Sequence, residues 1–229
     1  MKFSFCVLVV MALAVISTSV FAQETIFNVP SGDILEKGKI YSELDVAYFR
    51  NAHMGTYTPR IVVGIGHRIE LGVNLNGISS SGPSQAAPTP TIKWKVYDGR
   101  KGWAFLIGDD LFIPAQNRSY NTGNYVYGEM AKTFKSQTRL TFGAFDFTSN
   151  VIARGNKAGG QFGFEQPAGK RVIFAADWFT GHHGAGYFTP GAVVKLTSKI
   201  TAYGGYEIGN SNLAAGDRAV LIELGWNFN

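Results

Sequence analysis

Residues 220–229 read VLIELGWNFN and end the chain on two aromatic side chains within four positions. The alternating residues fall into two sets, Val220, Ile222, Leu224, Trp226 and Phe228 in one and Leu221, Glu223, Gly225 and Asn227 in the other. Successive side chains of an extended strand point to opposite faces. This stretch therefore predicts a β-strand with one apolar face and one mostly small or polar face.

The other end of the chain has the pattern of a secretory signal peptide. Met1 and Lys2 form a short basic start, residues 3–15 are almost wholly apolar, and residues 20–22 end in the small Ala22. We expect cleavage near Ala22 and Gln23, with a retained membrane anchor as the alternative. Cys6 is the one cysteine and leaves with this segment, so the mature chain is expected to have neither disulfides nor a thiol nucleophile.

Composition excludes several classes of protein. No stretch of the mature chain approaches the roughly 18 apolar residues of a membrane helix. The 28 glycines and the 14% aromatic content suit a β-rich chain with many tight turns. The net charge of +5 comes from scattered basic residues rather than a cluster, which argues against nucleic-acid binding. No cofactor, metal or catalytic motif is predicted.

Alternation along the mature chain predicts twelve strands and no helix. Their ranges are 39–50, 56–66, 68–78, 88–97, 102–113, 124–134, 138–148, 158–166, 171–180, 187–197, 200–208 and 219–228. The predicted layout is a signal peptide over 1–22, an irregular periplasmic lead-in over 23–38 and a single all-β domain over 39–229. An even number of antiparallel strands suits an up-and-down barrel, whose last strand pairs with the first near residues 40–48.

The predicted connections alternate between short and long. The short ones are 66–68, 98–101, 135–137, 167–170 and 198–199, and the longer ones are 51–55, 79–87, 114–123, 149–157, 181–186 and 209–218. Short turns at one end and long loops at the other are typical of transmembrane β-barrels. Both termini then lie at the short-turn, periplasmic end.

Charged residues gather on one face of the predicted strands. They are Glu43, Asp45, Arg60, Glu70, Lys93, Lys95, Glu129, Arg139, Glu165, Arg171, Asp177, Lys195, Glu207 and Glu223. In a membrane barrel these side chains line the lumen, whereas a soluble barrel shows such a face to water. Both signs occur in similar numbers, so we expect cross-strand pairing and weak ion selectivity.

Aromatic residues fall into two bands, as expected where a barrel crosses two bilayer interfaces. Those toward the short turns are Trp94, Tyr97, Trp103, Phe134, Trp226 and Phe228. Those toward the long loops are Tyr48, Tyr57, Tyr125, Phe147, Trp178, Tyr187 and Phe188. Aromatic side chains also favour strands in general, which explains part of the pattern.

Taken together, the signal peptide, the alternating connections and the aromatic terminal strand resemble the Gram-negative outer-membrane β-barrel class. That class usually places its aromatic residue last, whereas Phe228 is penultimate here. Residues 188–191 (FTPG) and 196–208 (LTSKITAYGGYEI) are similar to small channel-like families such as the phenol-degradation-linked outer-membrane proteins. This resemblance implies transport of small molecules and identifies no binding residue.

Two local motifs raise the question of a metal. His182 and His183 lie between glycines, but adjacent side chains of extended chain point apart, so we expect an exposed loop tip rather than a metal site. Asp109 and Asp110 offer too few oxygen ligands for Ca²⁺ and are expected at a solvated strand end.

Three functions follow from this fold. The first is an outer-membrane channel for small solutes through a narrow, mixed-charge lumen. The second is a plugged structural or adhesive barrel, and the third is a lipid-modifying hydrolase using Ser119 or Ser149 with His53, His182 or His183. The expected partners are outer-membrane lipid and lipopolysaccharide, the barrel-assembly machinery and a small solute. A soluble secreted barrel or sandwich is the alternative outside the membrane.

Overall fold

The computed structural model describes residues 24–81, 86–99, 101–115, 122–148, 150–152, 154–211 and 218–228. The expected signal peptide and its cleavage site lie outside these ranges. Within them, no helix has the length and the apolar character that crossing a membrane requires.

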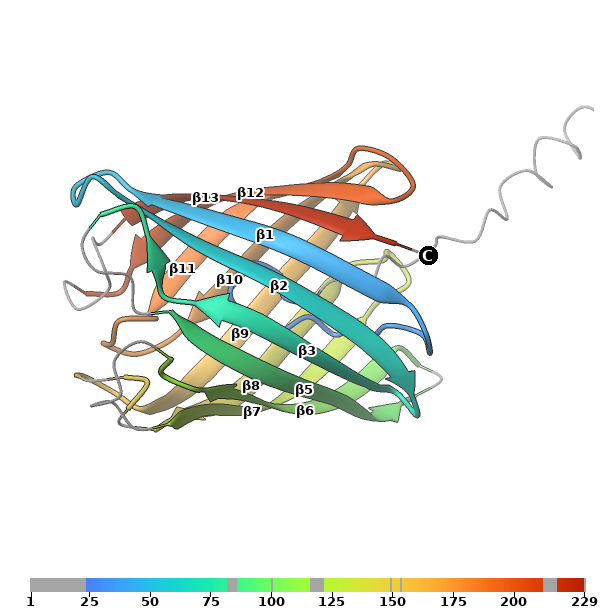
Figure 1. The fold of residues 1–229 in the computed structure, drawn as a ribbon. Coiled ribbons are helices and arrows are strands. Elements are labelled where there is room, and N and C mark those ends of the chain that lie inside the picture. Colours follow the sequence, from blue (N-terminus) through green and yellow to red (C-terminus); the bar gives the residue numbers. More distant parts are fainter. Residues whose placement is uncertain are drawn as a thin grey trace, which may run out of the picture.

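Twelve antiparallel strands close into one barrel, and a thirteenth two-residue strand extends one hairpin (Figure 1). The strands are β1 (Ile40–Phe49), β2 (Met54–Gly66), β3 (Ile69–Asn76), β4 (Ile78–Ser79), β5 (Ala87–Asp98), β6 (Trp103–Phe112), β7 (Gly123–Thr133), β8 (Arg139–Phe147), β9 (Ala158–Ala168), β10 (Val172–Phe179), β11 (Tyr187–Lys195), β12 (Ile200–Gly209) and β13 (Arg218–Asn227). Neighbours in the chain pair in sequence, except that β4 pairs only with β2, so β3 pairs with β5. The prediction of an all-β, twelve-stranded barrel is confirmed.

The barrel closes where β13 pairs with β1, as the sequence predicted. In this register Leu44 lies opposite Leu224, and Asp45 lies opposite Glu223. Ile222 is 57% exposed on the outer face, whereas Glu223 is 1% exposed on the inner face. The same alternation continues around the barrel, which gives it a wide apolar outer surface. Such a surface suits contact with lipid chains better than contact with water.

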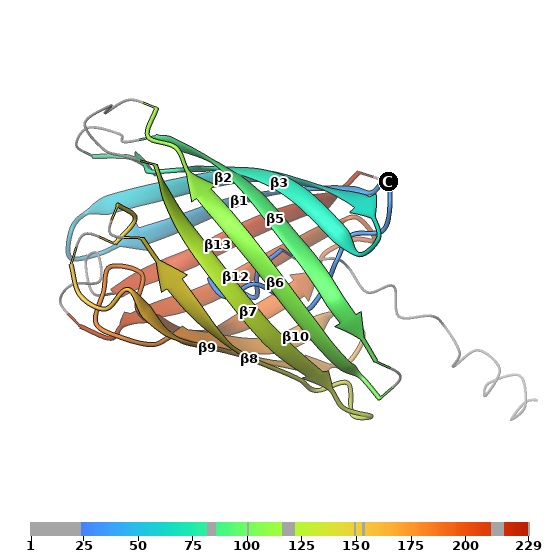
Figure 2. The same ribbon diagram turned by 90° about the horizontal axis from the view of Figure 1, so that it is seen from below.

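Short turns gather at one end of the barrel (Figures 1 and 2). They are residues 67–68, 99–102, 134–138, 169–171 and 196–199, and all but one of the links at the other end are longer. The exception is the β1–β2 link, residues 50–53, which was predicted as a longer loop over 51–55. Strand β2 begins at Met54, and His53 adopts a positive φ of 48° that permits a tight turn.

The two predicted aromatic bands differ in outcome. At the short-turn end, Trp94, Tyr97, Trp103, Phe134, Trp226 and Phe228 are all exposed on the outer surface. At the long-loop end, Tyr48, Trp178 and Phe188 are exposed and Tyr57 is half-buried. The prediction is wrong for Tyr125, Phe147 and Tyr187, which are buried inside the barrel. Each of these three lies an even number of positions from an inward-facing charged residue of its own strand, and therefore on the same face. Those charged residues are Glu129, Arg139 and Lys195, respectively.

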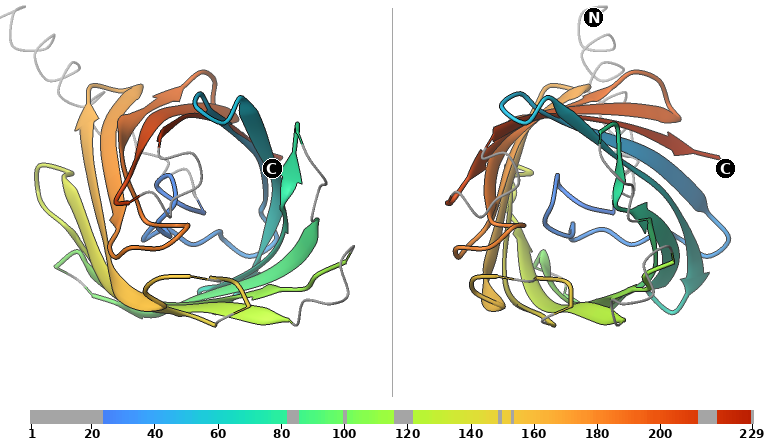
Figure 3. Two further views of the ribbon diagram at one scale, coloured as in Figure 1. Left: turned by 90° about the vertical axis from the view of Figure 1, so that its left-hand side faces the viewer. Right: turned by 60° about the vertical axis from the view of Figure 1, so that its left-hand side comes forward.

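The predicted periplasmic lead-in does not remain outside the barrel. Residues 24–35 fold into the lumen and cross it, as both views in Figure 3 show for the blue segment. Ile26 and Val29 are fully buried there, and Phe27 is nearly so. An irregular segment that carries such apolar side chains exposes less apolar surface to water when it packs on the inner wall than when it extends into solvent, which favours packing. We call residues 24–35 the plug segment.

Candidate functional site in the lumen

Asp177 of β10 anchors the plug segment to the barrel wall. Its Oδ2 atom accepts hydrogen bonds from the backbone nitrogens of Phe27 (3.0 Å), Asn28 (2.5 Å) and Val29 (2.7 Å). Consecutive backbone N–H groups that converge on one point form a concave anion site. The wall thus supplies a carboxylate to a turn of the plug segment that presents three donors.

A second attachment is made by Lys93 and Glu70, a basic and an acidic residue of the wall. The Nζ of Lys93 donates to the backbone oxygen of Glu24 (3.0 Å) and forms an ion pair with Glu70 (2.8 Å). Glu70 in turn accepts a hydrogen bond from the backbone nitrogen of Leu35 (2.9 Å). These contacts hold the two ends of the plug segment against β3 and β5.

Arg139 of β8 forms the third attachment. Its guanidinium pairs with Glu165 of β9 (2.5 Å and 2.6 Å) and with Asp33 of the plug segment (2.7 Å). Burial raises the pKa of Asp33, but the charge and the hydrogen bond of Arg139, together with the charges of Lys95 and Lys93, outweigh burial and hold that pKa below its ordinary value. Asp33 therefore stays ionised and paired at neutral pH.

A cavity of about 330 Å³ lies between the plug segment and the long-loop half of the wall. Its charged lining consists of Glu24, Asp45, Glu70, Asp110, Glu207 and Glu223 together with Arg60 and Lys93. Among the described residues, six carboxyl groups thus face two cationic side chains. Its aromatic lining consists of Phe27, Phe49, Phe112, Tyr125, Tyr127, Phe147, Phe179 and Tyr187.

The inward aromatic side chains pack against one another at the long-loop end. The Tyr125 ring stacks on Phe147 at a centroid distance of 4.9 Å and on Tyr127 at 5.0 Å. Phe145 meets Phe179 edge-on at 5.0 Å. Aromatic pairs at such distances contribute about 0.5–1.5 kcal/mol beyond their buried area, so these contacts stabilise this part of the wall.

His183 belongs to this aromatic cluster, contrary to the expectation of an exposed loop tip. Its side chain is 0% exposed and lies 5.6 Å from the Phe145 ring, while His182 is exposed as predicted. Its Nδ1 accepts a hydrogen bond from the backbone nitrogen of Ala185 (3.2 Å), so Nε2 carries the proton and donates to the Thr180 oxygen (2.7 Å). Burial lowers the pKa of His183, which keeps the ring neutral.

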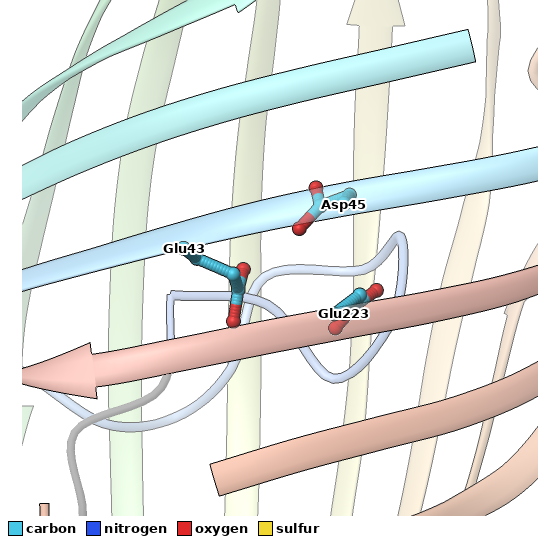
Figure 4. Close-up of side chains that lie close together, drawn as sticks. All are labelled: Glu43, Asp45 and Glu223. Atoms are coloured by element: carbon cyan, nitrogen blue, oxygen red, sulfur yellow. The ribbon is translucent and has the colours of Figure 1, made fainter. Parts of the chain in front are cut away.

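Three carboxylates meet where β1 and β13 close the barrel. Oxygen atoms of Glu43, Asp45 and Glu223 lie within 4.8 Å of one another, and all three side chains are buried (Figure 4). Arg60 contacts Asp45 directly and lies 3.4 Å from Glu24 and 3.5 Å from Glu43. The Tyr41 hydroxyl donates to Glu43 and lies 3.1 Å from the Tyr203 hydroxyl. We call Glu43, Asp45 and Glu223 the seam cluster.

The structure places the predicted lumen residues as follows. Buried inside are Glu43, Asp45, Glu70, Lys93, Glu129, Glu165, Asp177, Glu207 and Glu223, and partly buried on the same face are Arg60, Lys95, Arg139 and Lys195. Arg171 is instead exposed in the turn before β10, because that strand begins at Val172. Sequence reasoning missed Glu24, Asp33 and Asp110, two of which belong to the plug segment.

The remaining candidates do not form a second site within the described residues. Ser119 and Ser149 lie outside those residues, and His53 is exposed. Asp109 accepts hydrogen bonds from the Asn124 side chain at 3.0 Å, whereas Asp110 lines the cavity. Adjacent side chains of a strand point to opposite faces, so Asp109 and Asp110 of β6 do not act as a pair. The seam cluster is the one group of three acidic, histidine or cysteine residues in the described chain close enough to share an ion.

Comparison with known proteins shows the fold. No family model and no curated protein matches the sequence. Among solved structures, the KdgM porin in complex with disordered oligogalacturonate has a TM-score of 0.59 at 8% identity, over 83% of this chain and 99% of that chain. An outer-membrane channel from Pseudomonas putida F1 has a TM-score of 0.55 at 13% identity, over 85% and 97% of the two chains. Outer membrane phospholipase A from Escherichia coli has a TM-score of 0.46 at 11% identity, over 84% and 90%. The chain therefore has the fold of outer-membrane β-barrel channels.

Proposed function

We propose that this chain is an outer-membrane channel for small solutes, narrowed from within by the plug segment. The observation that carries this proposal is the polar cavity of about 330 Å³ inside a barrel whose outer surface is apolar. A polar lumen within an apolar wall is the arrangement that permits hydrophilic solutes to cross a bilayer. The channel fold of the two more similar solved structures agrees with this role.

The charge of the cavity favours cations and uncharged solutes over anions. Similar numbers of acidic and basic residues were expected, but Arg171 lies outside the lumen, and Glu24 and Asp110 add carboxyl groups to the cavity wall. In a confined lumen such an excess of acidic groups raises the local concentration of cations and repels anions. We therefore replace the expectation of weak ion selectivity with one of cation preference.

The plugged structural barrel remains the second candidate, because the plug segment is well anchored. Asp177, Lys93 and Arg139 bind it from three sides of the wall. A segment held by charge-assisted hydrogen bonds is not expected to leave the lumen by thermal motion alone. The two candidates differ in whether ions pass around the plug segment.

Planar-bilayer recording separates these candidates. We expect the mature chain to show small, cation-selective conductance, and a variant lacking residues 24–35 to show conductance several times larger. Heat-modifiable migration on gels controls for folding of the shortened barrel. If both proteins are folded and neither conducts, the channel proposal is wrong and the plugged barrel is favoured.

Location and partners follow from the same proposal. We place the folded barrel in the outer membrane, with lipid and lipopolysaccharide at its apolar surface and the barrel-assembly machinery as the factor that inserts it. Cell fractionation with an antibody to the mature chain tests this placement.

A further inference from the structure

The seam of the barrel carries like charges directly opposite each other. Asp45 of β1 faces Glu223 of β13 in the strand register, and Glu43 lies two residues from Asp45 on the same inward face. Like charges at facing positions of an antiparallel pair destabilise that pair. This pair also lies where the first and last strands must join, so the repulsion opposes closure of the barrel.

Several oxygens of the seam cluster have no hydrogen-bond partner within the described part of the chain. They are both carboxylate oxygens of Glu223, together with Oε1 of Glu43 and Oδ1 of Asp45. Glu223 is 1% exposed and points toward the other two carboxylates (Figure 4). A buried carboxylate without a donor has lost its hydration without replacement, which is unfavourable unless a cation or a proton compensates it.

Arg60 compensates only part of this negative charge. Its guanidinium contacts Asp45 and lies near Glu24 and Glu43, but it forms no ion pair with Glu223. The Tyr41 hydroxyl adds one hydrogen bond to Glu43, which brings no charge. Among the described residues, this one guanidinium thus pairs with three carboxylates and leaves Glu223 without an ion pair. Of the oxygens without a hydrogen-bond partner, Oε1 of Glu43 lies 3.5 Å from Nε of Arg60.

We propose that the seam cluster binds a divalent cation of the Ca²⁺ type. Carboxylate oxygens are the ligands that Ca²⁺ prefers, and its flexible shell of 6–8 oxygens tolerates water in several positions. Asp45 and Glu223 also line the cavity, so an ion and its water molecules can enter from the lumen. Bound there, the ion joins β1 to β13 and removes the repulsion at the seam. This proposal does not depend on conduction.

Calcium-dependent stability of the purified mature chain tests the proposal. The chain is refolded in detergent free of lipopolysaccharide, and its melting temperature is measured by heat-modifiable migration in EDTA and in CaCl₂ up to about 10 mM, a range that covers weak extracellular calcium sites. We expect the melting temperature to rise with the logarithm of Ca²⁺ concentration above the dissociation constant. Terbium luminescence excited through tyrosine gives a second reading, because Tyr41 contacts Glu43.

Two matched variants make the test specific. Glu223→Gln removes the unpartnered carboxylate, and we expect it to weaken the response to Ca²⁺ at least tenfold while raising the melting temperature in EDTA. Glu129→Gln changes another fully buried glutamate of the lumen, on β7, and should leave the response intact. An equal response in wild type and Glu223→Gln overturns the proposal. Absence of any response in wild type, with a melting temperature that falls as pH rises, also overturns it and indicates that the carboxyl groups share protons instead.

Discussion

Oδ2 of Asp177 lies 2.7 Å from the backbone nitrogen of Val29, a residue 148 positions earlier in the chain. The same oxygen accepts the N–H groups of Phe27 and Asn28, so one wall carboxylate determines the conformation of the plug turn. A hydrogen bond to a charged group contributes about 1.5–3 kcal/mol to stability, which is more than a hydrogen bond between neutral groups contributes. Loss of this charge is therefore the most direct way to loosen the plug segment.

The variant Asp177→Asn keeps the size of the side chain and removes its charge. We expect backbone amides of residues 27–29 to exchange with solvent about 10- to 100-fold faster, since roughly 1.4 kcal/mol corresponds to a factor of ten. Hydrogen exchange measured by mass spectrometry reads this directly. Asp146→Asn, an exposed aspartate on β8, is the control that should leave the exchange unchanged. Equal exchange in Asp177→Asn and wild type would show that the turn is held by packing alone.

Arg139 supports a different prediction, because it serves two carboxylates at once. Arg139→Met leaves Asp33 and Glu165 buried without their ion-pair partner, and removing one partner of a buried pair costs about 3–5 kcal/mol. Urea unfolding in lipid vesicles, followed by tryptophan fluorescence, measures the loss. Adding Asp33→Asn and Glu165→Gln to Arg139→Met should recover most of the stability. Failure of that triple variant to recover would assign the loss to packing rather than to unpaired charge.

The strands could be predicted from the sequence because each has one apolar face that the barrel turns outward. In β13, the alternation of Ile222, Glu223 and Leu224 is sufficient to place every side chain once the direction of one is known. The same alternation predicts that Tyr125 faces inward, because it lies four positions from Glu129 on β7 and so on the same face. Assigning that ring to an outer band gave more weight to its position along the barrel axis than to its face.

The plug segment could not be predicted in the same way. Residues 24–35 have no period of two or 3.6, so pattern analysis assigned them to an irregular lead-in. The one available signal was composition, since Ile26, Phe27 and Val29 are apolar residues in a segment predicted to lie in water. The seam cluster depends on register between strands far apart in sequence, which alternation within each strand does not specify.

Gly64 of β2 lies where the last residue of the plug segment, Leu35, and the residue after it, Glu36, approach the wall closely. A Cβ atom at this position would lie 2.2 Å from the backbone oxygen of Glu36 and 2.5 Å from that of Leu35. Because backbone must then shift, we expect Gly64→Ala to reduce the free energy of unfolding by about 1–3 kcal/mol. Gly204→Ala on β12 is the matched control, since nothing lies within 4 Å of its Cβ, and its effect should stay within about 0.5 kcal/mol. Equal effects of the two substitutions would contradict the close approach.

His183 predicts a pH dependence at the long-loop end. Its neutral ring accepts a hydrogen bond from Ala185 and lies against Phe145 and Phe147, and burial lowers its pKa below the ordinary value of 6.5. When the loop of residues 180–186 opens, the His183 ring regains its ordinary pKa and binds a proton below pH 6.5. In the closed loop the buried ring stays neutral at that pH. Closure is fully stable above that pH and weakens as the pH falls toward the lowered pKa.

We expect amide exchange in residues 180–186 to accelerate between pH 6.5 and pH 5, after correction for the intrinsic pH dependence of exchange. Ala185 lines the cavity, so the same change should widen its mouth and raise conductance in acid. His183→Phe should abolish the pH dependence, because it keeps an aromatic ring and removes the titrating nitrogen, at the cost of lower stability at pH 7.5. His182→Gln alters the exposed neighbour and should preserve the dependence. Corrected exchange that stays constant over this pH range in wild type would show that protonation of His183 does not open the loop.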